Sequence, residues 1–344
     1  MHNFCTLFDK NYLYRGLALY NSLIEHCPSF KLWVLCMDDI TYEILNKMNL
    51  EKVKLISLKA FEDNELLAVK KTRNAKEYFW TLSPSLPSYV LKNNPDLNSI
   101  AYLDSDLFFF SDPKPIYNEL GNGSVLIMEH KLPEGKKDKE KNVGKYNVGM
   151  MLFNNNKEGR KCLEWWRQKC NEWCYEIEEP TRFADQKYLD YFEKKFKNVV
   201  VSKQKGANLS YWNMKNFNNI IKKIDNKIYI GNHPLVFFHF SGINFYYPPN
   251  KLLPRGPIDP YTPPSKEKKI IYKIYFKAIY ETIEKIINAN PDFKHGFIPR
   301  PNIFKQIKNV AAPVVIELFK KYLGPLRPVL SKIKKKTYGQ KNKS

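Results

Sequence analysis

The stretch that decides the fold is Ile100-Ala-Tyr-Leu-Asp104-Ser-Asp106-Leu-Phe-Phe-Phe110. An apolar strand ends there in two carboxylates that are two residues apart, and a second apolar run follows. Side chains at positions i and i+2 of an extended segment point the same way, so both carboxylates can reach one hard cation. Oxygen ligands suit Mg²⁺ or Mn²⁺, and ligands of open α/β sheets gather beyond the carboxyl ends of the strands. The stretch therefore predicts a metal or phosphate site at a sheet edge, with a solvated acidic loop as the alternative.

Strand-like and helix-like segments alternate through the first 240 residues. The strand candidates are Phe4–Phe8, Leu32–Cys36, Val53–Ser57 and Ser99–Leu103. The helix candidates, with apolar residues at helical spacing, are Tyr12–His26, 157–178 and 184–196. The lysine-rich segment Gly135–Lys145 is expected to be a surface loop. This alternation predicts an α/β sandwich built on a largely parallel sheet.

Charge and proline content divide the chain. Residues 265–344 carry 19 basic and 5 acidic side chains, a net +14 of the chain's +21. Seven prolines fall between Pro248 and Pro264, a density that excludes regular helix and central strand. We therefore expect a first domain at 1–247, a proline-rich linker at 248–264 and a basic helical extension at 265–344. The helices expected in the extension are Lys268–Asn288 and Val310–Leu323.

Composition excludes several classes of protein. A hydrophobic fraction of 43% excludes disorder for most of the chain, and no apolar run is long enough for a membrane span. No secretory signal is evident, and the six cysteines form no pair of CxxC motifs. We expect buried, reduced thiols and a cytoplasmic protein.

Two further segments carry polar groups beside apolar strands. Asp9, Asn11 and Tyr12 follow the first strand, where a carboxylate, an amide and a ring can bind a nucleobase and ribose. A helix N-cap by Asp9 or Asn11 is the alternative. His239 ends the apolar run from Leu235, and as a metal ligand its nitrogen would favour Mn²⁺ over Mg²⁺; a core histidine is the alternative.

Five motifs in this order resemble glycosyltransferase family eight, the retaining, metal-dependent GT-A enzymes that include bacterial lipopolysaccharide galactosyl- and glucosyltransferases and glycogenin. The motifs are Asp9-x-Asn11-Tyr12, Leu103-Asp104-Ser-Asp106, Tyr146-Asn147-Val-Gly149-Met-Met-Leu-Phe-Asn154, Ala184-Asp185-Gln186 and His239-x-x-Gly242. The resemblance covers about residues 3–245 and implies a GT-A type, Rossmann-like nucleotide-diphospho-sugar transferase sandwich with a helical basic C-terminal extension.

The resemblance also implies residue roles. Asp9 would meet the uracil edge, Asn11 the ribose and Tyr12 the face of the base. Asp104 would contact ribose and metal, and Asp106 and His239 would complete the protein ligands of Mn²⁺ (or Mg²⁺). The groups expected at the donor sugar are Asn147, Asp185 and Gln186, the last on the face of the anomeric carbon where a nucleophile would stand. An amide is a poor nucleophile, so front-side transfer through an ion pair remains open beside double displacement.

One departure concerns the leaving group. Family members follow His-x-x-Gly with a lysine that neutralises the β-phosphate, whereas Ile243-Asn244-Phe245 follows Gly242 here. The cation is then expected from Arg73 or Lys76, for which a charged helix start is the alternative. Asn208 and Trp212 lie in a segment of small, amide and aromatic residues that suits sugar binding, with an aromatic corner of the core as the alternative.

The function implied is transfer of a hexose-type sugar from a UDP-sugar to a glycan or lipid-linked acceptor in lipopolysaccharide or surface polysaccharide synthesis. A non-catalytic carbohydrate- or nucleotide-binding protein on the same fold is the alternative. An aspartyl-phosphate phosphatase is disfavoured because Leu107-Phe108 follows the acidic pair. The basic extension is expected to bind the anionic inner face of the cytoplasmic membrane peripherally, with a merely solvated end as the alternative and no nucleic-acid partner.

Overall fold

The computed structural model describes residues 1–217, 220–225, 227–247 and 266–299. Contacts divide the chain into two units, Met1–Phe297 and Ile298–Ser344, and the first unit holds every element from β1 to α10. Three predicted features lie outside the described residues, namely the linker 248–264, the helix Val310–Leu323 and the polybasic end of the chain.

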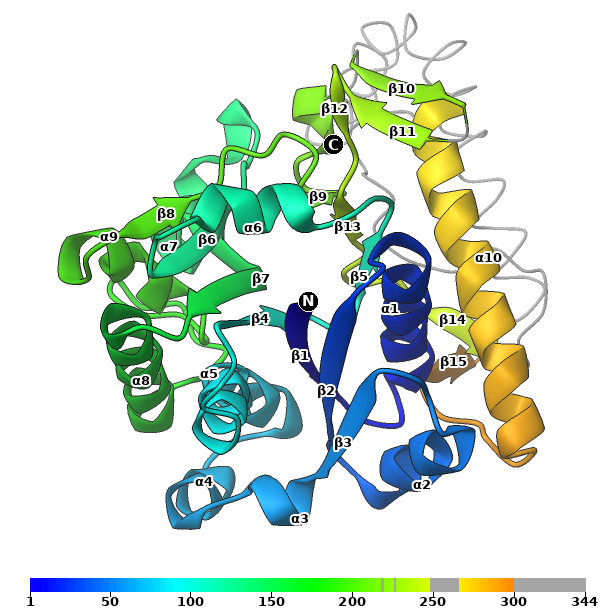
Figure 1. Ribbon diagram of the computed structural model, residues 1–344, viewed down its shortest axis with the longest axis horizontal. Helices are drawn as coiled ribbons and strands as arrows, with labels where there is room; N and C mark the ends of the chain where they lie inside the picture. Colours follow the sequence, from blue (N-terminus) through cyan, green and yellow to red (C-terminus); the bar gives the residue numbers. More distant parts are fainter. Residues whose placement is uncertain (218–219, 226, 248–265, 300–344) are drawn as a thin grey trace, which may run out of the picture. The chain divides into compact units, whose positions relative to one another are not determined.

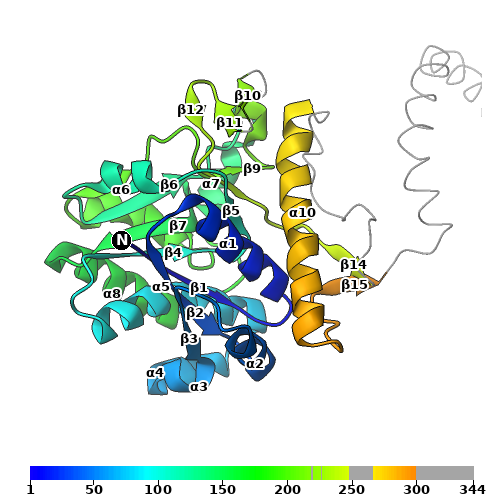
Figure 2. The same cartoon turned by 45° about the vertical axis from the view of Figure 1, so that its right-hand side comes forward.

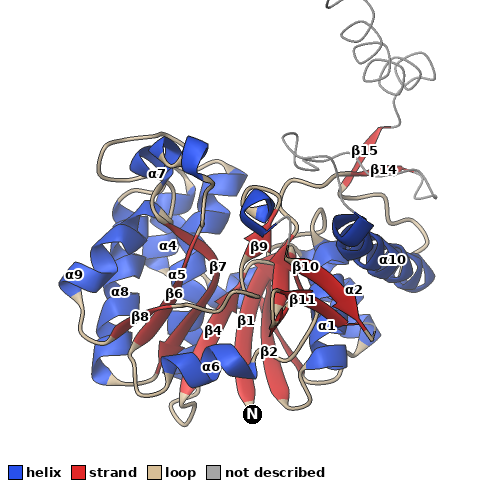
Figure 3. Ribbon diagram, turned by 90° about the horizontal axis from the view of Figure 1, so that it is seen from above, coloured by secondary structure: helices blue, strands red, loops and turns tan. Residues whose placement is uncertain are grey.

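A seven-stranded sheet forms the centre of the first unit (Figure 1). In spatial order its strands are β3 (Val53–Ser57), β2 (Phe30–Cys36), β1 (His2–Phe8), β4 (Ser99–Leu103), β7 (Tyr146–Asn154), β6 (Val125–Glu129) and β8 (Val199–Val201). β7 runs antiparallel to β4 and β6, and the other neighbours pair in parallel. Figure 3 shows β2, β1, β4, β7, β6 and β8 side by side in this order. The predicted α/β sandwich with a largely parallel sheet is confirmed.

Both faces of the sheet are covered, which explains the nearly continuous apolar sequence of its strands. In β1, Phe4 and Phe8 join one core cluster, and Cys5 and Leu7 join the other. The helices of the first cluster are α1 (Leu13–His26), α2 (Asp39–Met48), α6 (Lys114–Leu120) and α10 (Lys266–Ala289). Those of the second are α3 (Leu58–Phe61), α4 (Asn64–Lys70), α5 (Ala75–Asn93), α8 (Lys157–Glu172) and α9 (Phe192–Lys195).

Smaller sheets follow the acidic stretch. β5 (Leu107–Phe109), β13 (Phe237–His239) and β9 (Leu209–Ser210) form one three-stranded sheet in the order β5-β13-β9. β10 (Ile221–Ile224), β11 (Lys227–Ile230) and β12 (His233–Pro234) form another. The remaining short strands are β14 (Phe245–Tyr247) and β15 (Phe297–Pro299). The predicted strand that ends at His239 therefore lies beside β5 and outside the central sheet.

Helix α10 packs on the first core cluster, and Figure 2 shows it alongside α1. Ile271, Tyr275, Ile279, Ile283 and Ile286 follow helical spacing, and their side chains are fully or almost fully buried. The helix expected at Lys268–Asn288 is present and shares its core with the sheet. The division of the chain at 247 and 264 stays a prediction.

Three predicted elements differ from the structure. The helix expected at 157–178 ends at Glu172, because Trp173 is extended. The helix expected at 184–196 is a 3₁₀ turn, Lys187–Tyr191, followed by the single turn of α9. The loop expected at Gly135–Lys145 was wrong, because Asp138–Val143 forms the short helix α7 after a 3₁₀ turn at Glu134–Lys136. Charged pairs three residues apart accompany both turns, Lys137 with Glu134 and Lys141 with Asp138.

Candidate active site

Asp104, Asp106 and His239 converge beyond the end of β4. The His239 Nε2 atom lies 3.0 Å from Asp106 Oδ1 and 3.6 Å from Asp104 Oδ2. Asp106 and His239 are buried, whereas the Asp104 side chain is 30% exposed and therefore opens the cluster to solvent. The structure thus brings His239 to the Asp104–Asp106 pair, from which the sequence separates it by more than 130 residues.

Strand pairing explains why these groups meet. β13 pairs antiparallel with β5, and His239 lies opposite Leu107, the residue after Asp106. The Phe240 N–H donates to the Asp106 carbonyl oxygen at 2.9 Å, which fixes this register. On the other side, the Asp104 N–H donates to the Gly149 carbonyl oxygen at 2.8 Å and ties the pair to β7.

The protonation states of the cluster follow from burial and mutual charge. Burial raises the pKa of Asp104 to about 6 against the opposing His239 charge, and Asp106 adds to the rise. Burial would also raise the pKa of Asp106, but the adjacent His239 outweighs it and holds that pKa below its usual value. Burial opposes the charge of His239, yet Asp106 and Asp104 raise its pKa above the ordinary value. A divalent cation bound there would compete with protons for the two carboxylates and the imidazole.

A network of amide side chains surrounds the histidine. The Asn147 Oδ1 atom lies 3.3 Å from His239 Nδ1, so Nδ1 carries a proton toward it and Nε2 faces the carboxylates. The Asn147 Nδ2 atom donates to Gln186 Oε1 at 3.4 Å, and Gln186 Nε2 donates to the Val143 carbonyl oxygen at 2.7 Å. Gly149 leaves this space open, because a Cβ there would lie 2.6 Å from Asn147 Oδ1.

Asn208 and Trp212 line the same region. The Trp212 ring meets the His239 ring edge-on at a centroid distance of 5.2 Å, and its indole N–H donates to the His130 carbonyl oxygen at 3.2 Å. Asn208 is buried and donates from Nδ2 to the Glu129 carbonyl oxygen at 3.0 Å. Its Oδ1 atom has no hydrogen-bond partner among the described residues, although it lies near Gly149.

The turn after β1 presents its polar groups differently from a helix cap. The Asp9 Oδ1 atom accepts from the backbone N–H groups of Asn11 and Tyr12, and Oδ2 accepts from Asn11 Nδ2 at 2.7 Å. Helix α1 begins after Tyr12 without a side-chain cap. Tyr12 is 37% exposed, and burial together with the charges of Asp106 and Asp104 raises the pKa of its phenol. The turn therefore lies near the acidic cluster, and the Arg15 guanidinium lies over the Tyr12 ring at 4.2 Å from its centroid.

Arg73 and Lys76 contact groups outside the acidic cluster. Arg73 donates to the Asn171 carbonyl oxygen, and its guanidinium lies 3.9 Å from the Tyr175 ring centroid. Lys76 forms an ion pair with Glu176 and lies over the Trp80 ring. None of the contacts found among the described residues joins either cation to the acidic cluster. The alternative, a charged helix start, describes this segment, because Asn74 and Glu77 form a capping box.

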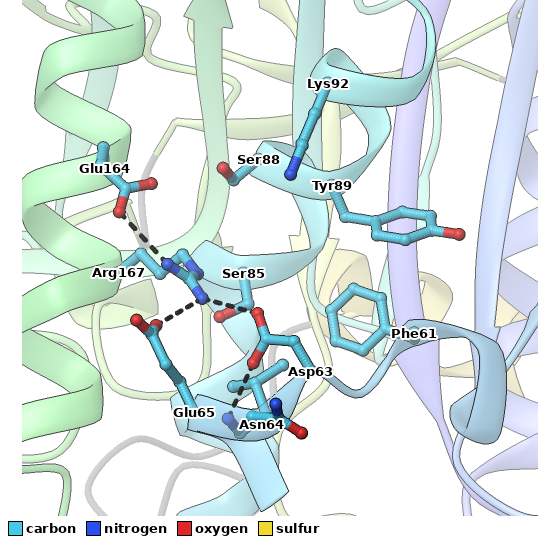
Figure 4. A pocket seen from close by; sticks show the side chains of 11 residues that line it. Phe61, Asp63, Asn64, Glu65, Ser85, Ser88, Tyr89, Lys92, Glu164 and Arg167 are labelled. Carbon is cyan, nitrogen blue, oxygen red and sulfur yellow. Dashed lines mark hydrogen bonds and ion pairs between the residues drawn. The ribbon is translucent and has the colours of Figure 1, made fainter.

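A cavity of about 440 Å³ between α4, α5 and α8 contains none of the predicted site residues (Figure 4). Its centre is the Arg167 guanidinium, which pairs with Asp63, Glu65 and Glu164 at 2.8–3.2 Å. These ion pairs join α8 to the turn of α4 and occupy both Nη atoms of the arginine. The Asp104–Asp106–His239 cluster lies outside this cavity.

Comparison with known proteins identifies the chain's family. A protein-family model for glycosyl transferase family 8 matches residues 3–230. The chain belongs to glycosyltransferase family 8. As a family 8 glycosyltransferase it is a transferase enzyme, and the predicted GT-A type α/β sandwich is confirmed. Family membership implies a nucleotide-sugar donor and a glycan acceptor.

Two proteins of Bacillus subtilis (strain 168) are similar to this family 8 glycosyltransferase. The uncharacterized protein YfnD is 33% identical over 310 residues, which cover 87% of this chain and 95% of YfnD. The uncharacterized protein YfnF is 35% identical over 246 residues, or 70% of this chain and 80% of YfnF. Among solved structures, the galactosyltransferase LgtC with donor and acceptor sugar analogues is 15% identical at a TM-score of 0.47, covering 81% of this chain and 95% of LgtC.

The possible metal-ligand atoms in the acidic cluster of this family 8 enzyme fit a divalent cation. The ligand atoms of Asp104, Asp106 and His239 all lie within 4.8 Å of one another. Adjacent ligands of an octahedral Mg²⁺-sized ion lie about 3 Å apart, close to the separations observed here. A second group, His2, Cys27 and Asp112, meets the same distance limit. Burial raises the pKa of the Cys27 thiol to about 11, so this thiol is protonated in the metal-free protein.

Two residues of the site escaped the sequence analysis. His130 directly follows β6 and is buried, and its Nε2 atom lies 3.5 Å from the Asn147 amide nitrogen. Burial lowers its pKa to about 4, so the imidazole is neutral. Arg15 is buried on α1 and acts electrostatically on Asp106. A polar residue at the end of an apolar strand was the available signal for His130, whereas Arg15 stands within a helix and carries no such signal.

Asp185 makes the free energy of unfolding depend on pH in the metal-free enzyme. Burial, helped by the Asp104 charge, raises its pKa to about 8. Between about pH 4 and pH 8 the folded form therefore keeps a proton that the unfolded chain has lost. Unfolding releases this proton, so the free energy of unfolding should fall as pH rises through that range. Asp185→Asn should be more stable than the wild type at about pH 8, by about 1–3 kcal/mol.

Urea unfolding of both proteins at two pH values measures this effect. At low pH, where the wild-type carboxyl is protonated in both states, the difference between the two proteins should shrink. An equal decline of the free energy of unfolding with pH in Asp185→Asn and in the wild type would contradict the assignment.

Proposed function

We propose that this enzyme transfers a hexose-type sugar from a UDP-sugar to a glycan or lipid-linked acceptor, with a divalent cation, Mn²⁺ in preference to Mg²⁺, and with retention of anomeric configuration. The observation that carries the proposal is the convergence of Asp104, Asp106 and His239 at the sheet edge. One imidazole nitrogen among carboxylate oxygens favours Mn²⁺. A cation held there would stabilise the charge of the departing nucleoside diphosphate.

Different residues around the Asp104–Asp106–His239 cluster bind different parts of the nucleotide-sugar donor. Asp9 and Asn11 bind the base edge and the ribose, and the Tyr12 ring stacks on the base. Their support is the turn after β1, where the Asp9 carboxylate already orders Asn11 and Tyr12. Asp104 reaches both the ribose and the cation because its side chain is the exposed member of the acidic pair.

The donor sugar lies on the amide network. Asn147, Asp185 and Gln186 bind its hydroxyls, and Asn208 and Trp212 complete the pocket. Both ends of the Gln186 amide are hydrogen-bonded, which fixes its orientation. An oriented amide is a poor nucleophile but a good dipole beside a developing positive charge. We therefore favour front-side transfer, in which the acceptor attacks from the face that the diphosphate leaves.

Release of UDP separates this function from that of a non-catalytic binding protein. The purified enzyme is incubated with UDP-hexoses without acceptor, once with Mn²⁺ and once with a chelator. Slow donor hydrolysis is expected only with Mn²⁺, because water can replace the acceptor. Binding of UDP-sugar without any release of UDP would favour the binding protein.

The acceptor belongs, in this proposal, to lipopolysaccharide or surface polysaccharide synthesis at the inner face of the cytoplasmic membrane. None of the described helices combines the length and apolar composition needed to cross a bilayer. Strand β10 contacts α10, and Figure 2 shows β10 near one end of that helix. Lys222 and Lys223 of β10 and Lys269 and Lys273 of α10 are exposed, and Ile224 of β10 is 50% exposed; we call these residues the basic surface. Lysines next to an exposed aliphatic side chain suit an anionic bilayer surface, at roughly 1 kcal/mol for each lysine.

Charge reversal on this surface tests membrane binding in the full chain. The combined variant Lys222→Glu/Lys223→Glu/Ile224→Ser should bind phosphatidylglycerol vesicles at least about tenfold more weakly than the wild type in sedimentation. The control variant Lys157→Glu/Lys194→Glu reverses the charge of two exposed lysines at other positions. Its vesicle binding should stay near that of the wild type. Equal binding by the two variants would remove this surface from the proposal.

A further inference from the structure

Arg15 lies in an unusual position for an arginine. It is 4% exposed, on the first turn of α1. Its Nη1 atom donates to the Asn11 carbonyl oxygen at 3.1 Å, and its Nη2 atom donates to the Ile243 carbonyl oxygen at 2.5 Å. The guanidinium lies 4.2 Å from the Tyr12 ring centroid and 4.8 Å from that of Tyr14. It therefore joins the turn after β1 to the segment after His239.

Within the part of the chain that the structure describes, the charge of Arg15 has no direct counter-ion. Among the described residues, no carboxylate oxygen lies within 4.0 Å of its guanidinium, in contrast to Arg167, which pairs with three carboxylates. The acidic residue that it influences is Asp106, on which it acts through space. A buried cation that only carbonyl oxygens and rings solvate is costly unless it meets an anion in the working state.

The site needs additional positive charge. A divalent cation balances the two carboxylates of Asp104 and Asp106, so a bound diphosphate would remain uncompensated. Phe245, in the segment after Gly242, is buried against Tyr14 and contributes no charge. Arg73 and Lys76 are engaged with other partners, as described above. Among the described residues, Arg15 is the cation that donates both to the Asn11 carbonyl of the Tyr12 turn and to the Ile243 carbonyl of the segment after His239.

We propose that Arg15 is the resident cation that offsets the charge of the donor's diphosphate group, and that it positions the Tyr12 turn and the segment after His239 around that group. The proposal rests on the proposed function, because it takes a nucleoside diphosphate donor as given. Arg15 acts mainly through space, since its hydrogen bonds hold protein carbonyls, and it is therefore a positioning residue.

The test compares UDP with uridine, which differ only in the diphosphate. Dissociation constants of both ligands are measured by calorimetric titration in the presence of Mn²⁺. The ratio of the uridine dissociation constant to the UDP dissociation constant should fall about tenfold in Arg15→Met. A tenfold change is the effect expected from losing one charge interaction across a partly buried site. Arg15→Lys keeps the charge and should hold the ratio within about threefold of the wild-type value. Arg167→Met removes a structural arginine and should leave the ratio unchanged.

The outcomes separate the possible roles. An equal loss of affinity for UDP and uridine in Arg15→Met would show a purely structural role and overturn the proposal, as would an unchanged ratio. If Arg15→Met does not fold, Arg15→Gln replaces it, because glutamine can still donate to the Ile243 carbonyl oxygen without charge. A wild type that does not prefer UDP over uridine would instead contradict the proposed function.

Discussion

Asp106→Asn should abolish metal-dependent sugar transfer and leave the fold intact. Asp106 lies 3.0 Å from His239 Nε2, and its backbone carbonyl already fixes β13 through the Phe240 N–H. The substitution keeps this backbone contact and the side-chain volume but removes the negative charge that binds the cation. Transfer measured as UDP release with Mn²⁺ should fall by at least about a thousandfold.

Asp112→Asn is the matched control for this experiment. Asp112 follows the same acidic stretch and accepts a hydrogen bond from the Lys114 N–H, away from His239. The activity of Asp112→Asn should stay within about twofold of the wild type, because Asp112 is not part of the Asp104–Asp106–His239 group. Retention of most transfer activity by Asp106→Asn, with an unchanged far-ultraviolet spectrum, would remove Asp106 from the cation site.

Tyr275→Ala should strongly destabilise the whole sandwich. Tyr275 of α10 is fully buried and stacks on Phe240 at a centroid distance of 3.7 Å, directly beside His239. Loss of a buried aromatic ring leaves a cavity that costs about 3–5 kcal/mol of the free energy of unfolding. Urea unfolding measured by tryptophan fluorescence and by circular dichroism should show this loss in one coincident transition.

Two variants sharpen the comparison. Tyr275→Phe keeps the ring, and the phenol oxygen has no hydrogen-bond partner among the described residues, so the change should cost less than about 1 kcal/mol. Lys277→Ala lies on the exposed face of the same helix and should change the free energy of unfolding by about 0.5 kcal/mol or less. A loss in Tyr275→Ala no larger than in Lys277→Ala would mean that α10 does not stabilise this core.

The parts of the fold that local sequence determines were predictable. The strands at 4–8, 32–36, 53–57 and 99–103 are short apolar runs, because both faces of a parallel-rich sheet are buried. Asp104 and Asp106 stood out because charged residues directly after such a run mark a sheet edge. The same rule applies to His130 after β6, and it was not used there.

What the sequence could not supply came from contacts between distant segments. The meeting of Asp106 with His239 depends on the pairing of β5 with β13, and apolar runs do not specify their partners. Arg15 lies in a helix, and an arginine in a helix is usually exposed, so its sequence position alone did not indicate burial. Its burial arises because the Ile243 segment and the Tyr275 helix cover that side of α1.

The short charged helix and the short 3₁₀ turn were also not predicted from the sequence. Asp138–Val143 consists mainly of lysine, asparagine and acidic residues, without an apolar stripe that would indicate a helix. Pairs such as Lys141 with Asp138 stabilise single helical turns locally, and these pairs are visible only once the turn has formed. The 3₁₀ turn at Lys187–Tyr191 is instead held by contacts with residues outside the turn, since Lys187 Nζ donates to the Glu179 and Asn142 carbonyl oxygens.

The central claim is that Asp104, Asp106 and His239 hold one divalent cation that in turn holds the diphosphate of the donor. Calorimetric titration of UDP into the wild-type enzyme, with Mn²⁺ and with a chelator, measures this coupling most directly. We expect UDP to bind at least about tenfold more tightly with Mn²⁺, a coupling free energy of about 1.4 kcal/mol or more. The same UDP affinity with Mn²⁺ and with the chelator would contradict the account.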